Sequence, residues 1–325
     1  MKFFRNLLLM SLLVCSPLAR AQDLAGDMTL HWLLIDGEGW QLVADNLQFP
    51  DGPTGDDKGN FYFCEMRSTP PVIWKYSPTG EKTKLVEGTM ASGLKFGPDG
   101  RLYACVGKDK QLVSFELPSG KKTVVAEDVQ PNDLVVSHKG NIYITETGKK
   151  QITLINPKTG EKKAVDTGIT APNGITLSPD QGTLAVSDSR GIYTYVFRIE
   201  ADGTLSAKSP YMTMRTAVDT EAKSPDNRSP VYKTVSGGDG MNTDTYGRYY
   251  VSSHLGVQVF DPTGRMCGVL PNPGTKGMTS VGFAGPAMDD MYVTCSDKIF
   301  KRKVKAHGNL FFLPPKPETL VPPKK

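Results

Sequence analysis

Four oxygen-bearing side chains, two carboxylates and two amides, occupy one repeated position in this sequence. Asp51, Asn132 and Asp239 each stand eight residues before a recurring turn-and-strand phrase, and Asn173 stands nine before its own copy, which has one extra turn residue. Ser92 holds the same position in another copy. Carboxylate and amide oxygens are ligands that hard divalent cations prefer. The four residues therefore predict a cation site if the fold brings them together, although any one of them could simply form a turn.

The recurring phrase reveals the elements that must position these residues. A turn residue is followed by a short apolar or aromatic run in six places: Gly59-Asn-Phe-Tyr-Phe, Gly100-Arg-Leu-Tyr-Ala, Gly140-Asn-Ile-Tyr-Ile, Gly182-Thr-Leu-Ala-Val, Gly247-Arg-Tyr-Tyr-Val and Asp289-Asp-Met-Tyr-Val. The intervals are 41, 40, 42, 65 and 42 residues. A period near 40 built of short β runs is typical of propeller blades. The sequence thus predicts an all-β, six-bladed β-propeller whose metal site lies at the mouth of the central tunnel.

The remaining stretches fit around this ring. The long interval holds a polar insertion at 209–236, which we expect to be a surface excursion that covers the tunnel mouth. Residues 40–47 resemble the outer strand of the last blade, which would close the ring and remove exposed sheet edges. We expect the propeller to span 22–308 and a loose Pro- and Lys-rich tail to span 309–325.

The start of the chain predicts export. Lys2 and Arg5 precede a short apolar run, and a small-residue cleavage site ends at Ala21, so residues 1–21 are typical of a secretion signal. We expect a bacterial protein that is periplasmic or secreted. The formal net charge of +4 includes three basic signal residues and falls to +1 without them, which favours neither nucleic acid nor a membrane surface as partner. The oligomeric state is not determined by the sequence.

The cysteines left after signal cleavage leave their own question open. An exported protein could oxidise Cys64, Cys105, Cys267 and Cys295, and four cysteines permit three pairings. None shows the spacing of a zinc or redox motif. The sequence does not decide between disulfides and buried thiols.

Motifs around the repeated position resemble those of the senescence-marker-protein (SMP-30)/gluconolactonase family, in its bacterial exported branch. They occur in the family's order: Asp51-Gly-Pro53, Pro131-Asn-Asp133, Pro172-Asn-Gly174, Asp239-Gly-Met241 and Phe283-Ala-Gly-Pro286. The resemblance covers about residues 48–300. It implies a six-bladed propeller that holds one divalent cation, Ca²⁺ first and Zn²⁺ or Mg²⁺ as alternatives, and hydrolyses a small-molecule sugar lactone.

The resemblance also implies roles for individual residues. Asn173 and Asp239 match the family's metal ligands, and Asn132 matches the asparagine that faces both metal and substrate. Asp51 stands where the family has a glutamate, so the metal's identity is the property that this departure affects most. Gln130 replaces an arginine that some members use for the substrate.

The implied chemistry needs few parts. The cation would polarise the lactone carbonyl, and Asp239 would act as general base toward the attacking water or, as an alternative, as nucleophile. Residues six past the repeated turns should end strands at the tunnel mouth, so we expect Glu146 and Asp188 near the substrate or paired with basic residues at the rim. His254, next to this position, could also face the substrate.

Two other functions use the same fold. A phosphotriesterase or arylesterase could use the same cradle of ligands. A propeller that binds sugar or protein without catalysis could keep a metal for structure alone. Loss of activity in an Asp239 variant would separate catalysis from a binding platform.

Overall fold

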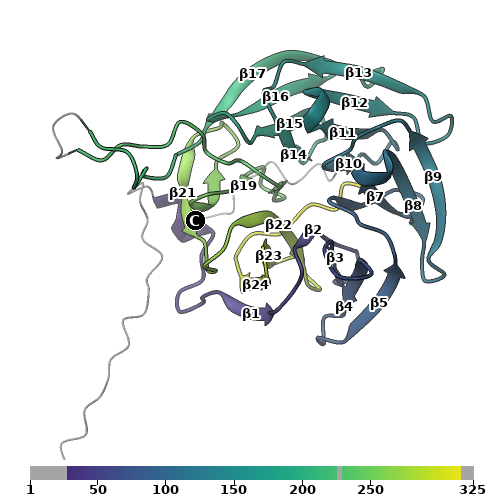
Figure 1. Cartoon of the computed structure of the whole chain (residues 1–325), viewed down its shortest axis with the longest axis horizontal. Coiled ribbons are helices and arrows are strands. Elements are labelled where there is room, and N and C mark those ends of the chain that lie inside the picture. Colours follow the sequence, from purple (N-terminus) through teal and green to yellow (C-terminus); the bar gives the residue numbers. More distant parts are fainter. Residues whose placement is uncertain (1–27, 225–228, 316–325) are drawn as a thin grey trace, which may run out of the picture.

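The computed structural model describes residues 28–224 and 229–315, and these form the predicted ring of six four-stranded antiparallel sheets (Figure 1). The residues at 1–21 on which export rests lie outside the described residues. The innermost strands are β2 (Pro50–Gly55), β6 (Leu94–Phe96), β10 (Leu134–Val136), β14 (Pro172–Leu177), β18 (Met241–Thr243) and β22 (Met278–Ala284). The second strands are β3 (Phe61–Glu65), β7 (Leu102–Val106), β11 (Ile142–Glu146), β15 (Thr183–Asp188), β19 (Tyr249–Ser253) and β23 (Asp290–Cys295).

The outer half of each blade is more exposed. The third strands are β4 (Val72–Tyr76), β8 (Gln111–Glu116), β12 (Gln151–Ile155), β16 (Tyr193–Ile199), β20 (Gly256–Phe260) and β24 (Lys298–Lys303). The outermost strands are β5 (Lys82–Glu87), β9 (Lys121–Glu127), β13 (Lys162–Thr167), β17 (Leu205–Thr213), β21 (Met266–Pro271) and, in the last blade, β1 (Gln41–Ala44). Helical structure among the described residues is limited to three short 3₁₀ turns, η1 (Met28–Trp32), η2 (Gly107–Asp109) and η3 (Thr147–Lys149). No helix among them is long and apolar enough to cross a membrane.

The recurring phrase forms a strand because its aromatic residue ties the strand to the preceding turn. In the first blade the Asp56 carboxylate accepts hydrogen bonds from the Asn60 amide and the Tyr62 hydroxyl. The fifth blade repeats this pattern, with Asp244 accepting from the Tyr250 hydroxyl at 2.7 Å. Buried polar groups are stable only when they are hydrogen-bonded, so an aspartate in the turn and a tyrosine in the strand specify the same geometry in these two blades.

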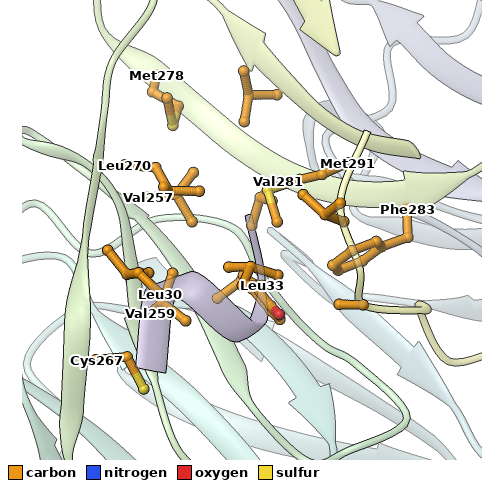
Figure 2. Packing of buried hydrophobic residues seen from close by; sticks show 14 of the residues in the cluster. Leu30, Leu33, Val257, Val259, Cys267, Leu270, Met278, Val281, Phe283 and Met291 are labelled. Carbon is orange, nitrogen blue, oxygen red and sulfur yellow. The ribbon is translucent and has the colours of Figure 1, made fainter. Parts of the chain in front are cut away.

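The ring is closed by both chain ends. β1 pairs with β24, so the prediction that residues 40–47 complete the last blade is confirmed. Upstream, Leu30 of η1 and Leu33, which directly follows η1, pack against Val257 and Val281 and thereby fill the space between the fifth and sixth blades (Figure 2). Closure removes exposed sheet edges, which otherwise recruit other chains.

The segment after β24 seals one end of the tunnel. It crosses the centre of the ring toward β10 (Figure 1, yellow), where Phe311 packs with Val135. The Asn309 amide donates to the Asp244 carbonyl at 2.7 Å, and the Phe312 ring lies 6.0 Å from that of Phe96. We call residues 307–315 the strap. The prediction of a loose tail is therefore wrong for residues 309–315, because their apolar side chains fill the end of the tunnel opposite the predicted ligand residues, which we call the lower end. Residues 316–325 lie outside the described residues.

The insertion between the fourth and fifth blades is shorter than predicted. β17 continues to Thr213, so only residues after it leave the sheet. Their described part is joined by a bridge between Val218 and Tyr232 and points away from the centre of the ring (Figure 1). The direction of this segment does not support the expectation that it covers the tunnel mouth. The bridge between Val218 and Tyr232 holds the segment together where it projects outward from the ring.

Within the described part of the chain, Cys64, Cys105, Cys267 and Cys295 are buried thiols that form no disulfide. They lie on strands of four different blades, where they pack as small apolar side chains. The question that the sequence left open is thus answered in favour of buried thiols.

Candidate active site at the tunnel mouth

The structure places the predicted site residues at equivalent points of the ring. Asp51 pairs with Cys64 across the first blade. In the third and fifth blades, the Asn132 amide donates to the Thr145 carbonyl at 2.8 Å, and the Asp239 amide donates to the carbonyl of Ser252 at 2.9 Å. Each partner is the residue five past the turn of its blade. All four predicted ligand positions therefore enter the inner strands at one end of the tunnel.

A ring of hydroxyls fixes these entry points, and sequence reasoning missed it. The Thr145 hydroxyl donates to the carbonyl of Asn173 at 2.5 Å, and the Ser187 hydroxyl donates to the carbonyl of Asp239 at 2.9 Å. Each bond joins one blade to the backbone of a ligand position in the next. The signal was available, since a hydroxyl or thiol recurs five residues past every repeated turn. Its small size and polarity suit a buried contact with a neighbouring carbonyl.

Two glycines allow the inner strands to approach closely. A Cβ added at Gly174 would lie 2.2 Å from the Asp239 carbonyl oxygen, and one at Gly240 would lie 2.0 Å from the Ser280 hydroxyl. These contacts are far below van der Waals separation. The glycines that follow Asn173 and Asp239 are therefore required for the close approach of the fourth, fifth and sixth blades.

The two predicted carboxylates repel each other in this confined space. Burial raises the pKa of Asp51 to about 7, with a further contribution from Asp133. Burial also raises the pKa of Asp239 well above its usual value, and the charges of Asp51 and Asp133 add to this; the Gly240 amide and the Asn173 side chain oppose it. Asp51 and Asn173 thus both lie near enough to Asp239 to influence its pKa. The role of these three residues as metal ligands stays a prediction.

Asn132 contributes its backbone to the same ring. Its carbonyl accepts a hydrogen bond from the Ser92 hydroxyl at 2.5 Å, which links the second and third blades. Its amide side chain is partly exposed at the tunnel mouth. A role for this side chain toward metal or substrate stays a prediction.

Two charged residues of the tunnel were not singled out from the sequence. Asp133 follows Asn132, and its carboxylate accepts hydrogen bonds from the amides of Leu134 at 2.8 Å and Ile175 at 3.3 Å. Lys95 lies deeper, on β6. The signal for Lys95 was a single charge between the apolar Leu94 and Phe96 on an innermost strand.

Glu146 and Asp188 are held by the protein itself. Glu146 is 1 % exposed; its carboxylate pairs with the Lys149 ammonium at 2.8 Å and accepts from the Gln130 amide and the Thr153 hydroxyl. Asp188, 2 % exposed, accepts from the backbone amide of Ala171. Burial alone would raise the pKa of Glu146, but the Lys149 ammonium and the other donors outweigh it and hold that pKa below its usual range. These contacts favour a structural role over the predicted contact with substrate.

We expect Glu146→Gln to lower the free energy of unfolding by about 1–3 kcal/mol, because charged hydrogen bonds to a buried carboxylate are lost. KM should stay unchanged. Urea unfolding and steady-state kinetics measure the two quantities. Thr153→Val, which removes one donor to the same carboxylate, serves as the control and should reproduce part of the stability loss. A raised KM with unchanged stability would instead return Glu146 to the substrate site.

His254 lies at the rim of the mouth. It is exposed at the end of β19, and a Cβ added at Gly237 would lie 2.3 Å from its Nε2 atom. Burial of part of the ring and the nearby Lys233 charge lower the pKa of His254. The ring thus lies against Gly237, which stands two residues before Asp239 in the chain. Contact of His254 with substrate stays a prediction.

The other end of the ring differs in chemistry. A cavity of about 420 Å³ lies there, between the strap and the turns that contain Asp57, Gln181 and Pro286. None of the four predicted ligand residues lines it. We place the candidate site at the mouth, because the carboxylates with raised pKa values, Asp51 and Asp239, lie there.

The donor set at the mouth fits a hard cation. Among the described residues, no three His, Cys, Asp or Glu side chains come close enough together to hold one ion. The predicted set has only two carboxylates, however, and its other oxygens belong to amides. Besides burial, the charge of Asp51 raises the pKa of Asp239, and a bound cation would offset this repulsion.

A closed six-bladed propeller with carboxylates and amides at one tunnel mouth defines a class of proteins that bind or convert small molecules there. Residues 49–297 match the SMP-30/Gluconolactonase/LRE-like region. The chain belongs to this family, as its motifs indicated.

Individual relatives are distant. A gluconolactonase of Zymomonas mobilis is 22 % identical over 308 residues, which cover 82 % of each chain. The structure of a gluconolactonase from Xanthomonas campestris superposes with a TM-score of 0.70 at 19 % identity, covering 86 % of this chain and 93 % of that one. A calcium-binding regucalcin from Agrobacterium tumefaciens gives 0.67 at 18 % identity, covering 84 % and 97 %. At such identities the structural likenesses establish the fold.

Proposed function

We propose that this protein is a lactonase-type hydrolase that opens a sugar lactone with the help of one divalent cation, Ca²⁺ first and Zn²⁺ or Mg²⁺ as alternatives. The convergence of Asp51, Asn173 and Asp239 at the tunnel mouth is the observation that carries the proposal. Family membership and the gluconolactonase relative support the substrate class. The calcium-binding relative supports the first choice of cation.

Asp51, Asn173 and Asp239 would hold the cation, with Asn132 at its side. When bound, the cation supplies a Lewis acid that polarises the lactone carbonyl and stabilises the developing oxyanion. Aspartate at position 51 is one methylene shorter than the family's glutamate, so its reach toward the centre of the tunnel is smaller. The ring of hydroxyls holds the backbone of these residues, so their side-chain oxygens need no large rearrangement when the cation binds.

Asp239 would remove the proton from the attacking water. Burial and neighbouring carboxylates make it a stronger base than an exposed aspartate, and a nearby positive charge would partly reverse this. A lactone is an activated ester, so a base of moderate strength suffices. Direct attack by Asp239 is the alternative that trapping of an acyl-enzyme would reveal.

Substrate would enter from the mouth. The strap closes the lower end, where Leu310, Phe311 and Phe312 line a void of only about 20 Å³. His254 at the rim and Asn132 at the entrance are the side chains that we propose contact the sugar. We further propose that the protein is exported, on the basis of residues 1–21 alone.

The deciding experiment is hydrolysis of D-glucono-δ-lactone by the chelator-treated chain lacking residues 1–21, followed by addition of Ca²⁺, Zn²⁺ or Mg²⁺. Proton release above the spontaneous rate that one of these ions restores would support the proposal and identify the ion. Activity on an aryl ester or phosphotriester but on no lactone would assign the same cradle to another substrate. Tight metal binding without any hydrolysis would indicate a binding platform.

A further inference from the structure

Lys95 is a cation built into the wall of the tunnel. It lies on the three-residue strand β6, paired with Tyr103 of β7. Together with Thr54 and Asn242 it lines the void of about 20 Å³ beneath the carboxylates. The side chain is partly exposed into the tunnel. Lysine at such a position is unusual, because burial disfavours its charged form unless other charges compensate.

The Asp133 carboxylate, on the side of the tunnel mouth, supplies the compensating negative charge. A Cβ added at Gly93 would lie 2.7 Å from Oδ1 of Asp133, so this carboxylate lies against the backbone just before β6, two residues before Lys95. Residues two apart on a strand face the same side. Lys95 and the Asp133 carboxylate therefore both face the tunnel at neighbouring levels, with the predicted cation site at the level above.

The Lys95 ammonium interacts with these carboxylates through space. Within the described part of the chain, the Lys95 ammonium forms no direct ion pair with a carboxylate. Burial lowers the pKa of Lys95, while the charges of Asp133 and Asp51 oppose that effect. Burial likewise raises the pKa of Asp133, and Lys95 counters it. The lysine thus already neutralises part of the negative charge that a metal ion would otherwise balance.

We propose that Lys95 is a fixed internal cation that weakens the binding of a divalent ion at the tunnel mouth by supplying part of the site's counter-charge. The inference rests on the proposed cation site at Asp51, Asn173 and Asp239. The reason is electrostatic: two positive charges in one narrow tunnel repel each other more strongly than in water. The affinity for metal is therefore set by a residue that does not touch the metal.

The test is calcium titration by calorimetry on the full chain without residues 1–21, after removal of metal. Lys95→Met should bind Ca²⁺ at least about 10-fold more tightly than the wild type, which corresponds to about 1.4 kcal/mol. Lys95→Arg keeps the charge and should stay near the wild-type affinity. Lys122→Met on β9 of the same blade removes an exposed lysine and should change nothing.

A second pair of variants keeps the test valid if Lys95→Met folds poorly. Lys95→Gln removes the charge but stays polar, and should also tighten binding. The double variant Lys95→Met/Asp133→Asn removes one charge of each sign and should return the affinity to near the wild-type value. Unchanged Ca²⁺ affinity in both Lys95→Met and Lys95→Gln would overturn the inference. Failure of both the wild type and Lys95→Met to bind Ca²⁺ would overturn it as well.

This readout is separate from catalysis. If the variants show the expected affinities but no lactone is hydrolysed, the role of Lys95 stands and the proposed substrate falls. If hydrolysis depends on metal but the affinity ignores Lys95, the proposed function stands and this inference falls.

Discussion

Asp239→Asn should abolish metal-dependent lactone hydrolysis while leaving the propeller folded. The substitution keeps an oxygen at the cation site but removes the group that takes the proton from water. Loss of a general base lowers kcat by about 10²–10⁴-fold. Stopped-flow proton release with saturating metal measures this, and circular dichroism checks the fold.

Stability provides an independent readout of the same variant. Because burial and neighbouring carboxylates disfavour the ionised form of Asp239, its neutral replacement should leave the metal-free protein at least as stable as the wild type at pH 8. Asp57→Asn, at an exposed turn on the opposite end of the ring, is the matched control and should retain full activity. More than a tenth of wild-type kcat in Asp239→Asn would rule out the assignment of Asp239 as base.

The metal-free protein should become less stable as the pH rises from about 4 to 7. The pKa of Asp51 is raised from 3.8 in its ordinary environment to about 7 in the fold, with burial as the main cause. A group with a raised folded pKa stabilises the fold below its unfolded pKa, and that contribution is lost as the pH rises through the folded value. At 1.36 kcal/mol per pH unit, the loss would be at most about 4 kcal/mol, and solvent in the tunnel reduces it. Asp239 acts in the same direction.

Urea unfolding at pH 5, 6, 7 and 8 in the presence of a chelator measures this dependence. Asp51→Asn should flatten it, because the residue that titrates is gone. Added Ca²⁺ should stabilise the protein more at pH 8 than at pH 5, since ionised carboxylates bind the ion better. A slope that persists unchanged in Asp51→Asn would show that Asp51 is not the group responsible.

Much of the architecture was readable from the sequence because a propeller repeats. The Gly-to-Tyr phrase near every 40 residues specifies a turn and a second strand, and the Asp56–Tyr62 hydrogen bond shows why those residue types recur. The same periodicity gave the register of Asp51, Asn132, Asn173 and Asp239. Equivalent positions in a ring are neighbours in space whatever their separation along the chain, so sequence counting alone located the mouth.

What the sequence could not determine are contacts between segments that share no repeat. Glu146 carries a charge at the predicted level of the mouth, yet its oxygens are used by Lys149 and Thr153, and only side-chain direction decides that. The strap carries no copy of the phrase, and its course across the tunnel depends on which apolar surface is left uncovered below the inner strands. The electrostatic interaction of Lys95 with Asp133 likewise joins two different blades, because the Asp133 carboxylate lies against Gly93, two residues before Lys95.

The sequence by itself therefore determined the ring, the order of its blades and the entry points of the inner strands, since local turn and strand chemistry recurs at a fixed period. Only the tertiary structure decided which charged side chains face the tunnel, which are consumed by neighbouring donors, and which end is closed. Burial and through-space electrostatics depend on atoms from several blades at once, and a single repeat does not encode them.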